Sequence, residues 1–304
     1  MYLGFLTVCL GNIPLREKAE WAAKNGFKSL EIACWPKSND RDYSSSDIDV
    51  AALTQKEADE IKGYLKDLGL TISSLAYYDN NLHNNPAKRA FVNEHVKKCV
   101  DAAVMLGAPA VGTFVGRNID KTIADNFDEF EEVFKKLVGY AEEKGIQIII
   151  ENCPMEGWQV QGQPGTISFT PELWEEMFRR VPNKNFGLNY DPSHLRFQLI
   201  DYITPIAAFK DRIFHVHAKD SEVFDDKLAY YGVFNRHLGE GEGYWRFRMP
   251  GLGQVKFAEM VKALKDIGYD GVISIEHEDP LYEGSEAKVK EGLELGRKYL
   301  EKLL

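Results

Sequence analysis

The feature that most constrains the fold is an alternation of short apolar runs with helix-like stretches, repeated eight times along the 304 residues. The clearest apolar run, residues 146–152, has the length of a buried strand. A typical helix start follows at Thr170-Pro171, a capping residue and a proline in the first turn. Eight such units predict a closed (β/α)8 TIM barrel rather than an open doubly wound sheet. We therefore expect an α/β fold with a single domain spanning 1–304.

The expected elements follow from spacing and from the Gly, Asn and Pro residues between them. Strands are expected at 3–8, 27–34, 70–76, 110–115, 146–152, 185–188, 212–218 and 271–276. Helices are expected at 14–25, 54–68, 88–106, 125–144, 170–180, 201–209, 256–267 and 286–303. A long loop, residues 221–254, separates the seventh strand from its helix. No Gly-x-Gly-x-x-Gly follows the first strand, which argues against a dinucleotide-binding domain.

Charge and composition exclude several classes of function. The 47 acidic residues outnumber the 37 basic ones, and a net charge of −10 argues against nucleic-acid binding. Apolar runs fall short of the ~18 residues of a membrane span. The four cysteines are scattered without a Cys-x-x-Cys pair, which indicates reduced core thiols. With a first segment that lacks a basic leader, we expect a cytoplasmic protein that has neither a nucleic-acid nor a membrane partner.

Polar residues stand at the ends of the fifth, sixth, seventh and eighth predicted strands: Glu151, Asp191, His217 and Glu276. In a TIM barrel these ends share one mouth, where active sites lie. Three carboxylates without a cation would repel one another, whereas three carboxylates and an imidazole suit a divalent ion. Such an oxygen-rich set favours Mn²⁺, Co²⁺ or Mg²⁺, with Zn²⁺ as an alternative. The plainer interpretation of the Asp191–His194 stretch is a capped turn with a packed imidazole.

Strand alternation separates the remaining histidines. His215 and His217 point to the same face, and His217 is nearer the mouth, so His217 is the expected ligand. His215, one layer deeper, is expected to be a hydrogen-bonded core residue. His277 should point into the layer between barrel and helices, and His95, within a helix, is expected to be structural.

Four motifs carry a resemblance to a known family: Glu151-Asn152, Asp191-Pro-Ser-His194, His217-Ala-Lys-Asp220 and Ser274-Ile-Glu276. In this order they resemble the xylose isomerase-like barrel superfamily, above all its sugar phosphate isomerase/epimerase group with the ketose 3-epimerases. The resemblance implies that the residues at positions 151, 191, 217 and 276 hold a metal ion. It also implies that the two glutamates act as acid and base and that His194 contacts the substrate.

The chain departs from the ketose-epimerase pattern at Val223, where those enzymes carry an arginine six residues beyond the ligand histidine. The long loop offers other basic residues, and we expect Arg236 or His237 to reach the substrate when the loop closes. Gly239, Gly241 and Gly243 would let it bend. The alternative is a packed surface loop or a contact in a homo-oligomer, to which Arg246 and Arg248 could contribute.

The predicted function is a divalent-metal-dependent sugar isomerase or epimerase that removes a proton next to a carbonyl of a ketose or keto-sugar, through an enediolate. Lys219 is expected beside the site, and Trp35 and Trp158, with Tyr77 and Trp245, could form walls for a sugar. An inosose-type dehydratase with the same metal site is the main alternative. An endonuclease would need histidines at the third and fourth strand ends, and residues 74–77 and 112–115 contain none. A non-catalytic sugar-binding barrel would lack the ligands.

Overall fold

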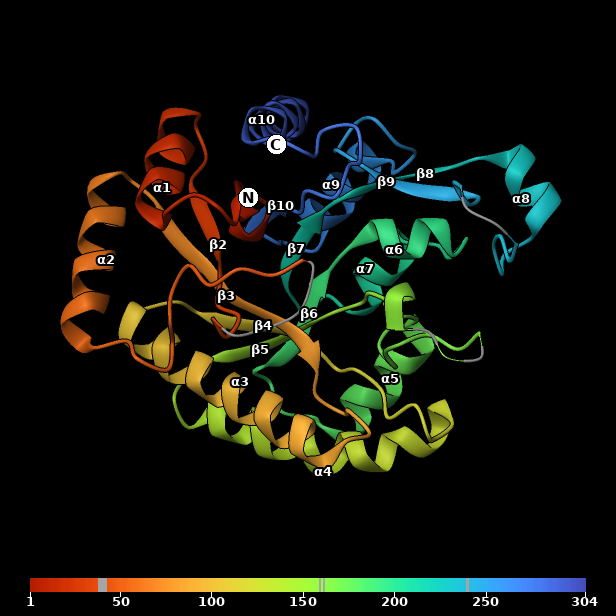
Figure 1. Cartoon of the computed structure of the whole chain (residues 1–304), viewed down its shortest axis with the longest axis horizontal. Coiled ribbons are helices and arrows are strands. Elements are labelled where there is room, and N and C mark those ends of the chain that lie inside the picture. Colours follow the sequence, from red (N-terminus) through yellow and green to blue (C-terminus); the bar gives the residue numbers. More distant parts are fainter. Residues whose placement is uncertain (38–42, 159, 161, 239–240) are drawn as a thin grey trace.

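The computed structural model describes residues 1–37, 43–158, 160, 162–238 and 241–304. Its centre is a closed barrel of eight parallel strands, which confirms the predicted (β/α)8 fold (Figure 1). Around the wall the order is β1, β10, β7, β6, β5, β4, β3, β2. The barrel strands are β1 (Tyr2–Leu6), β2 (Ser29–Ala33), β3 (Thr71–Asn80), β4 (Ala110–Phe114), β5 (Gln147–Glu151), β6 (Phe186–Tyr190), β7 (Ile213–Ala218) and β10 (Val272–Ile275).

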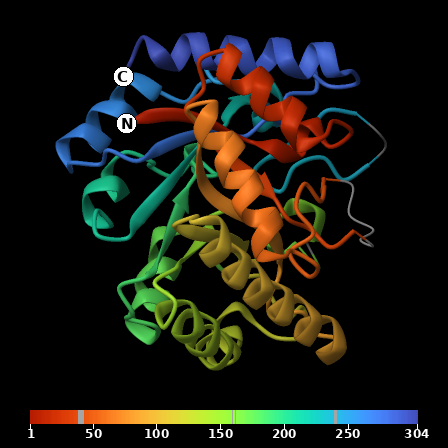
Figure 2. The same ribbon diagram turned by 90° about the vertical axis from the view of Figure 1, so that its left-hand side faces the viewer.

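Helices cover the outside of the barrel (Figures 1 and 2). They are α1 (Leu15–Lys24), α2 (Gln55–Asp67), α3 (Pro86–Leu106), α4 (Ile123–Glu142), α5 (Pro171–Arg180), α7 (Thr204–Ala208), α9 (Phe257–Asp266) and α10 (Glu286–Glu301), with short 3-10 turns η1 (Thr7–Leu10) and η2 (Glu156–Trp158). Because the barrel closes between β1 and β10, the two chain ends lie beside each other in both views. Within the described ranges, no helix is both long and apolar enough to cross a membrane.

The layer between barrel and helices is built from apolar helix faces, as α4 illustrates. Phe127, Phe130 and Phe134 recur every three or four residues, so they share one buried face of this helix. The rings of Phe130 and Phe134 lie 4.8 Å apart, and Phe134 lies 5.6 Å from the ring of Phe186 on β6. Fully burying one such ring contributes about 1.5–3 kcal/mol, so this face holds α4 against the strands.

One helix was not expected from the sequence. The pattern predicts a loop after Asp191, but α6 (Pro192–Phe197) begins at the next residue. The Asp191 carboxylate accepts a hydrogen bond from the backbone N–H of Ser193 at 2.7 Å, and Pro192 occupies the first helical position. The proline that ends β6 therefore also starts a helix, a position that suits its fixed φ.

The long loop after β7 contains regular structure that the sequence does not predict. β8 (Asp220–Val223) and β9 (Trp245–Arg248) pair antiparallel, and α8 (Asp225–Tyr231) follows β8. The Asp220 carboxylate accepts hydrogen bonds from the backbone N–H groups of Gly251, Gly253 and Val255 at 2.8–3.0 Å. This clamp joins the end of the long loop, residues 221–254 and called the excursion below, to its start. α8 projects away from the barrel beyond the clamp (Figure 1).

Candidate functional site

The four predicted metal ligands lie on neighbouring strands at one mouth of the barrel. Glu151 is the last residue of β5, Asp191 follows β6, His217 lies in β7, and Glu276 follows β10. These strands are consecutive in the wall. All four side chains are buried. The parallel arrangement thus places them at a common end, as expected.

Glu151 and Glu276 meet at the imidazole of His217. Nδ1 of His217 lies 2.7 Å from Glu151 Oε1 and 3.0 Å from Glu276 Oε2. A second imidazole lies somewhat farther from the carboxylates, since His194 Nε2 is 3.5 Å from Asp191 Oδ2 and 3.7 Å from Glu151 Oε1.

Ligand-capable atoms of Glu151, Asp191, His194 and Glu276 all lie within 4.8 Å of one another. His194, which the sequence suggests as a substrate contact, is therefore also placed as a ligand candidate. His217 and His194 thus both present a ring nitrogen to these carboxylates.

Reciprocal hydrogen bonds fix the ends of β5 and β6. The Asn152 side chain donates to the backbone carbonyl of Asp191 and accepts from its backbone N–H, both at 2.8 Å. Glu151 precedes Asn152, so this pairing sets the separation of two candidate ligands. The asparagine of the Glu151-Asn152 motif thus holds the end of β5 to the end of β6.

The sequence interpretation missed Glu31, which lies inside β2 and is fully buried. Glu31 Oε2 is 2.8 Å from Nε2 of His217 and accepts a hydrogen bond from the Ser274 hydroxyl at 2.9 Å. Its other oxygen accepts from the Tyr78 hydroxyl at 2.6 Å. The available signal was a charged residue in an otherwise apolar strand. Because carboxylates commonly orient ligand histidines, Glu31 has the geometry to hold the His217 ring.

His215, His277 and His95 lie in the surroundings that the sequence predicts for them. His215 is buried, with Nδ1 2.8 Å from Asn189 Oδ1 and Nε2 3.1 Å from the Ser73 hydroxyl, which confirms a core role. His277 is buried and faces α10, where Gly292 leaves room for its ring. His95 on α3 has Nε2 2.7 Å from the carbonyl of Cys34.

Lys219 brings a buried cation to the same carboxylates. Its Nζ lies 2.7 Å from Glu276 Oε2 and 2.9 Å from Glu278 Oε2. Asp191 Oδ2 is 3.5 Å away. Burial disfavours the charged ammonium, but these carboxylates outweigh burial and raise the pKa of Lys219 well above its ordinary value. Glu278 is a further residue that the sequence interpretation missed.

The pKa values of the two glutamates are shifted in opposite directions. Burial, followed by repulsion from Glu151, raises the pKa of Glu276 to about 7. Burial acts in the same direction on Glu151, yet the charge of His217 and its hydrogen bond with Glu151 hold the pKa of Glu151 well below its ordinary value. For His217, burial favours the neutral ring, but three carboxylates, Glu31 foremost, raise its pKa well above the ordinary value.

A cavity of about 180 Å³, here called the catalytic pocket, opens onto these groups. Glu151, His194, Lys219, Glu276 and Trp35 are among its lining residues. Trp158 is not among the described lining residues, although its ring lies 5.8 Å from that of Phe114, which lines the pocket. Of the two tryptophans predicted to cover a sugar, Trp35 is therefore the one among the described residues that lines this pocket.

The excursion after β7 reaches the pocket through Phe247, a residue not singled out from the sequence. Its ring lies 5.4 Å from that of His194 and 4.4 Å from Lys219 Nζ. Trp245, an expected wall residue, stacks instead on Phe197 at 3.9 Å. Val223 is buried beside Phe197 and Tyr244 in a small apolar cluster.

Arg236 and His237 do not line the catalytic pocket in the described structure. Arg236 donates to the carbonyl of Leu238 at 2.8 Å and to the Tyr231 hydroxyl at 3.3 Å, and His237 is exposed. Gly239 lies outside the described residues. The Arg246 and Arg248 side chains both pair with Glu222 within the excursion.

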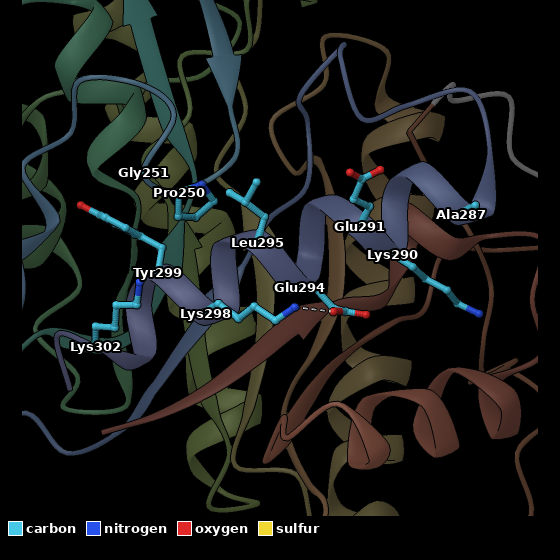
Figure 3. Close-up of a pocket in the computed structure, with 10 residues that line it drawn as sticks. All are labelled: Pro250, Gly251, Ala287, Lys290, Glu291, Glu294, Leu295, Lys298, Tyr299 and Lys302. Carbon is cyan, nitrogen blue, oxygen red and sulfur yellow. Dashed lines mark hydrogen bonds and ion pairs between the residues drawn. The ribbon is translucent and has the colours of Figure 1, made fainter.

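A larger surface depression, of about 590 Å³, lies against α10 beside Pro250 and Gly251 (Figure 3). An ion pair between Lys298 and Glu294 crosses it at 2.8 Å. It contains none of the candidate ligands, so size alone does not locate the site.

Comparison with curated proteins finds uncharacterized proteins, inosose dehydratases and an inosose isomerase among the similar chains. An uncharacterized protein of Methanocaldococcus jannaschii is 28% identical over 204 residues, which cover 64% of this chain and only 59% of that protein. The inosose dehydratase of Lacticaseibacillus casei is 27% identical over 243 residues, which cover 74% and 75%.

Comparison with solved structures finds the same barrel. The D-psicose 3-epimerase of Clostridium cellulolyticum H10 with D-tagatose has a TM-score of 0.71 at 15% identity, covering 100% of this chain and 99% of that one. The IolI protein with a bound zinc atom has a TM-score of 0.70 at 20% identity, covering 100% and 96%. A family model described as xylose isomerase-like TIM barrel matches residues 19–299, which confirms the resemblance seen in the four motifs.

Proposed function

This chain belongs to the xylose isomerase-like TIM barrel family, and on that premise we propose that it is a metal-dependent sugar isomerase or epimerase. The observation that carries the proposal is the meeting of Glu151 and Glu276 at His217, at 2.7 and 3.0 Å. Two carboxylates held this close around a substrate can remove a proton from one carbon face and return one to the other. The reacting carbon would lie next to the carbonyl of a ketose or keto-sugar.

The residues at the mouth fit a divalent cation. Within the described part of the chain, Asp191 Oδ2 and both ring nitrogens of His194 are buried and have no hydrogen-bond partner. Buried polar atoms are rarely left so, and an ion would satisfy them. Three carboxylates gathered with imidazole nitrogens form a donor set for Mn²⁺, Co²⁺ or Mg²⁺, and also accept Zn²⁺.

Glu151, Asp191 and Glu276 would hold the ion together with His217 or His194. When bound, a divalent ion supplies Lewis-acid stabilisation of negative charge on nearby oxygen atoms. This stabilisation would suit a reaction in which negative charge develops on a substrate oxygen as the neighbouring carbon loses its proton. Such a site acts on small oxygen-rich molecules, which suits a sugar substrate.

The protein's own groups divide the proton transfer. Glu151 would work on one face of the substrate and Glu276 on the other, one removing the proton and the other returning it. Acid–base assistance of this kind contributes about 10²–10⁴-fold, or roughly 3–5 kcal/mol. Lys219, 2.7 Å from Glu276, would orient that carboxylate and donate to a substrate oxygen. His194 would hold a sugar hydroxyl, and Trp35 would cover one sugar face.

A dehydratase that acts on an inosose-like ring is the second candidate. It is favoured by the buried ammonium of Lys219, which lies between Glu276 and Glu278 and could protonate a departing hydroxyl. Glu151 or Glu276 would remove the proton from the carbon next to the one that loses the hydroxyl. The 27% identity to an inosose dehydratase also supports this candidate.

The test is an assay of the metal-loaded protein in heavy water against ketoses, 3-keto-glycosides and inososes. Epimerisation or isomerisation should place solvent deuterium on the reacting carbon, as read by NMR. Dehydration would instead give a product that has lost water by mass spectrometry. Full retention of the substrate's own hydrogen at that carbon would indicate hydride transfer and overturn the proton-transfer mechanism.

A further inference from the structure

A second cavity, of about 610 Å³, lies at the same barrel mouth and takes no part in the proposed proton transfer. We call it the side cavity. Its walls come from the end of β3, from the segments that follow β2, β3, β4 and β5, and from the first turns of α3. The lining residues that matter here are Tyr77, Asp79, Asn80, Lys88, Arg117 and Trp158.

The side cavity and the catalytic pocket share an aromatic wall. Trp35 and Phe114 line the catalytic pocket, while Tyr77 and Trp158 line the side cavity. The rings meet in pairs, Trp35 with Tyr77 at 6.2 Å and Phe114 with Trp158 at 5.8 Å. The catalytic pocket, at about 180 Å³, is smaller than the ~300–1,000 Å³ usual for small-molecule sites. A substrate larger than one sugar unit therefore needs the neighbouring space.

Arg117 gives the side cavity a buried positive charge. The side chain is 5% exposed, and it donates to the backbone carbonyls of Pro164 at 3.0 Å and Lys121 at 3.4 Å. Among the described residues, no carboxylate pairs with it, and its Nε has no acceptor. A buried cation without a counterion is costly, so an anion supplied by a ligand would be strongly favoured.

The position of Arg117 is fixed before any ligand arrives. Its backbone N–H donates to Asn80 Oδ1 at 3.0 Å, and the Asn80 amide donates back to its carbonyl at 2.9 Å. Gly116 precedes it with a φ of +80°, and a side chain there would collide with Asn80. Such preorganisation is typical of binding groups because it lowers the entropy lost on binding.

The remaining charges leave the side cavity net positive. Lys88 is exposed at its rim and forms no ion pair with any described residue. Asp79 is the one carboxylate among the described lining residues. Its oxygens accept hydrogen bonds from the Asn80 N–H at 2.7 Å and the Tyr77 hydroxyl at 3.3 Å. Burial lowers the pKa of His83, so this lining imidazole is neutral at pH 7.

We propose that the side cavity binds an anionic group, a phosphate or a carboxylate, with Arg117 as its anchor and Lys88 at its rim. In the reaction proposed above, this group is the end of the sugar substrate away from the reacting carbons, and this part of the inference rests on the proposed function. The substrate class is then a sugar phosphate or a sugar acid. The shared chemistry is an oxyanion that accepts several N–H donors from a guanidinium.

The direct test is calorimetric titration of the full chain, stripped of metal, with inorganic phosphate and with D-gluconate. Arg117→Gln should weaken binding of the preferred anion by about tenfold or more, as expected for a lost charged hydrogen bond. Lys88→Gln should weaken it less. Lys136→Gln, which removes an exposed lysine from α4, is the matched control and should leave binding unchanged. Tighter binding of phosphate would indicate a sugar phosphate as substrate, and tighter binding of gluconate a sugar acid.

Equal binding by wild type and Arg117→Gln would overturn the proposal, and so would a wild type that binds neither probe. If Arg117→Gln does not fold, the same titration is made with Lys88→Glu. Reversal of the charge at the rim must weaken anion binding in the side cavity, and unchanged binding would overturn the proposal. Turnover of neutral sugars without any anion binding would refute the side cavity alone. Anion binding that depends on Arg117, in a protein inactive on every sugar, would support this site and refute the proposed function.

Discussion

Glu31 and His217 meet inside the barrel, with Glu31 Oε2 2.8 Å from Nε2 of the imidazole. This contact holds Nε2, so that Nδ1 of the same ring faces Glu151 and Glu276. A ligand histidine whose other nitrogen is held by a carboxylate has a defined tautomer and ring orientation.

Glu31→Gln should therefore weaken metal binding. Loss of an outer partner of this kind typically costs about 10–100-fold in metal affinity. The measurement is calorimetric titration of Mn²⁺ or Zn²⁺ into the metal-free protein. Ser274→Ala is the control, because it removes one hydrogen bond to Glu31, of 2.9 Å, while the carboxylate itself remains, and it should have a smaller effect. Wild-type affinity in Glu31→Gln would show that the carboxylate does not position His217.

Glu276→Gln should abolish most of the turnover while the fold persists. The amide keeps the shape of the side chain but cannot take up the proton, so we expect a fall of about 10²–10⁴-fold in kcat. Glu278→Gln is a matched control, since Glu278 also contacts Lys219, at 2.9 Å. Equal losses in both variants would mean that these carboxylates act through Lys219 rather than as a base.

Removal of metal should lower the melting temperature. An ion that binds only the folded chain adds about 2.7 kcal/mol to the free energy of unfolding when its concentration is 100 times Kd. Thermal unfolding with added Mn²⁺ and with excess chelator measures the difference. Asp191→Asn should show a much smaller response. A wild type that melts at the same temperature in both conditions has no such site.

His95 should make stability depend on pH below neutrality. Burial lowers the pKa of His95 in the folded protein, and Lys98 acts in the same direction. The hydrogen bond with the carbonyl of Cys34 and the charges of Asp49 and Asp79 oppose it only in part. Below the unfolded value of ~6.5 the unfolded chain therefore binds a proton that the folded chain does not. Stability should fall as pH drops from that value toward the folded pKa, with a slope of at most about 1.4 kcal/mol per pH unit.

Urea unfolding of wild type and His95→Gln between pH 7 and pH 5 isolates this contribution. The difference in unfolding free energy between the two proteins should shrink as the pH falls. His237→Gln, which removes an exposed imidazole, controls for the loss of a histidine. A difference that stays constant across this range would show that His95 titrates alike in both states.

Arg236→Ala and His237→Ala test whether the excursion closes over the mouth. The contacts of Arg236 with Leu238 and Tyr231 are local, so a substrate can replace them at small cost. We expect a higher KM for the true substrate at unchanged metal occupancy. Lys227→Gln on α8, whose lysine pairs with Glu242, is the control. If both alanine variants match the wild type, the excursion is structural.

The barrel was predictable because parallel strands buried on both faces are continuous apolar runs, and residues 146–152 form such a run. β8 and β9 were not predictable in the same way. β8 has only four residues and includes Asp220 and Glu222, which are residue types depleted in strands. What pairs them is the clamp of Asp220 on backbone groups more than thirty positions away, a contact that no local pattern reveals.

The candidate site also contains residues that the sequence pattern predicts and residues that only long-range contacts reveal. Glu151, Asp191 and Glu276 were predictable because strand ends of a barrel share one mouth. Glu31 was missed because it lies within β2, where its partner His217 is remote in sequence and adjacent only in the closed barrel. The place of Lys219 between Glu276 and Glu278 likewise depends on β7 and β10 being neighbours.

The Asp220 clamp has a consequence for how this fold tolerates change. Together with the β8–β9 ladder it closes the excursion at its base, between Val223 and Trp245. We expect that lengthening or shortening the stretch between β8 and β9 leaves the register of the barrel strands unchanged, because β8 and β9 pair with each other in a separate two-stranded sheet. Residues 224–244 are thus a natural insertion point, where the chain can acquire new recognition elements while the chemistry below stays in place.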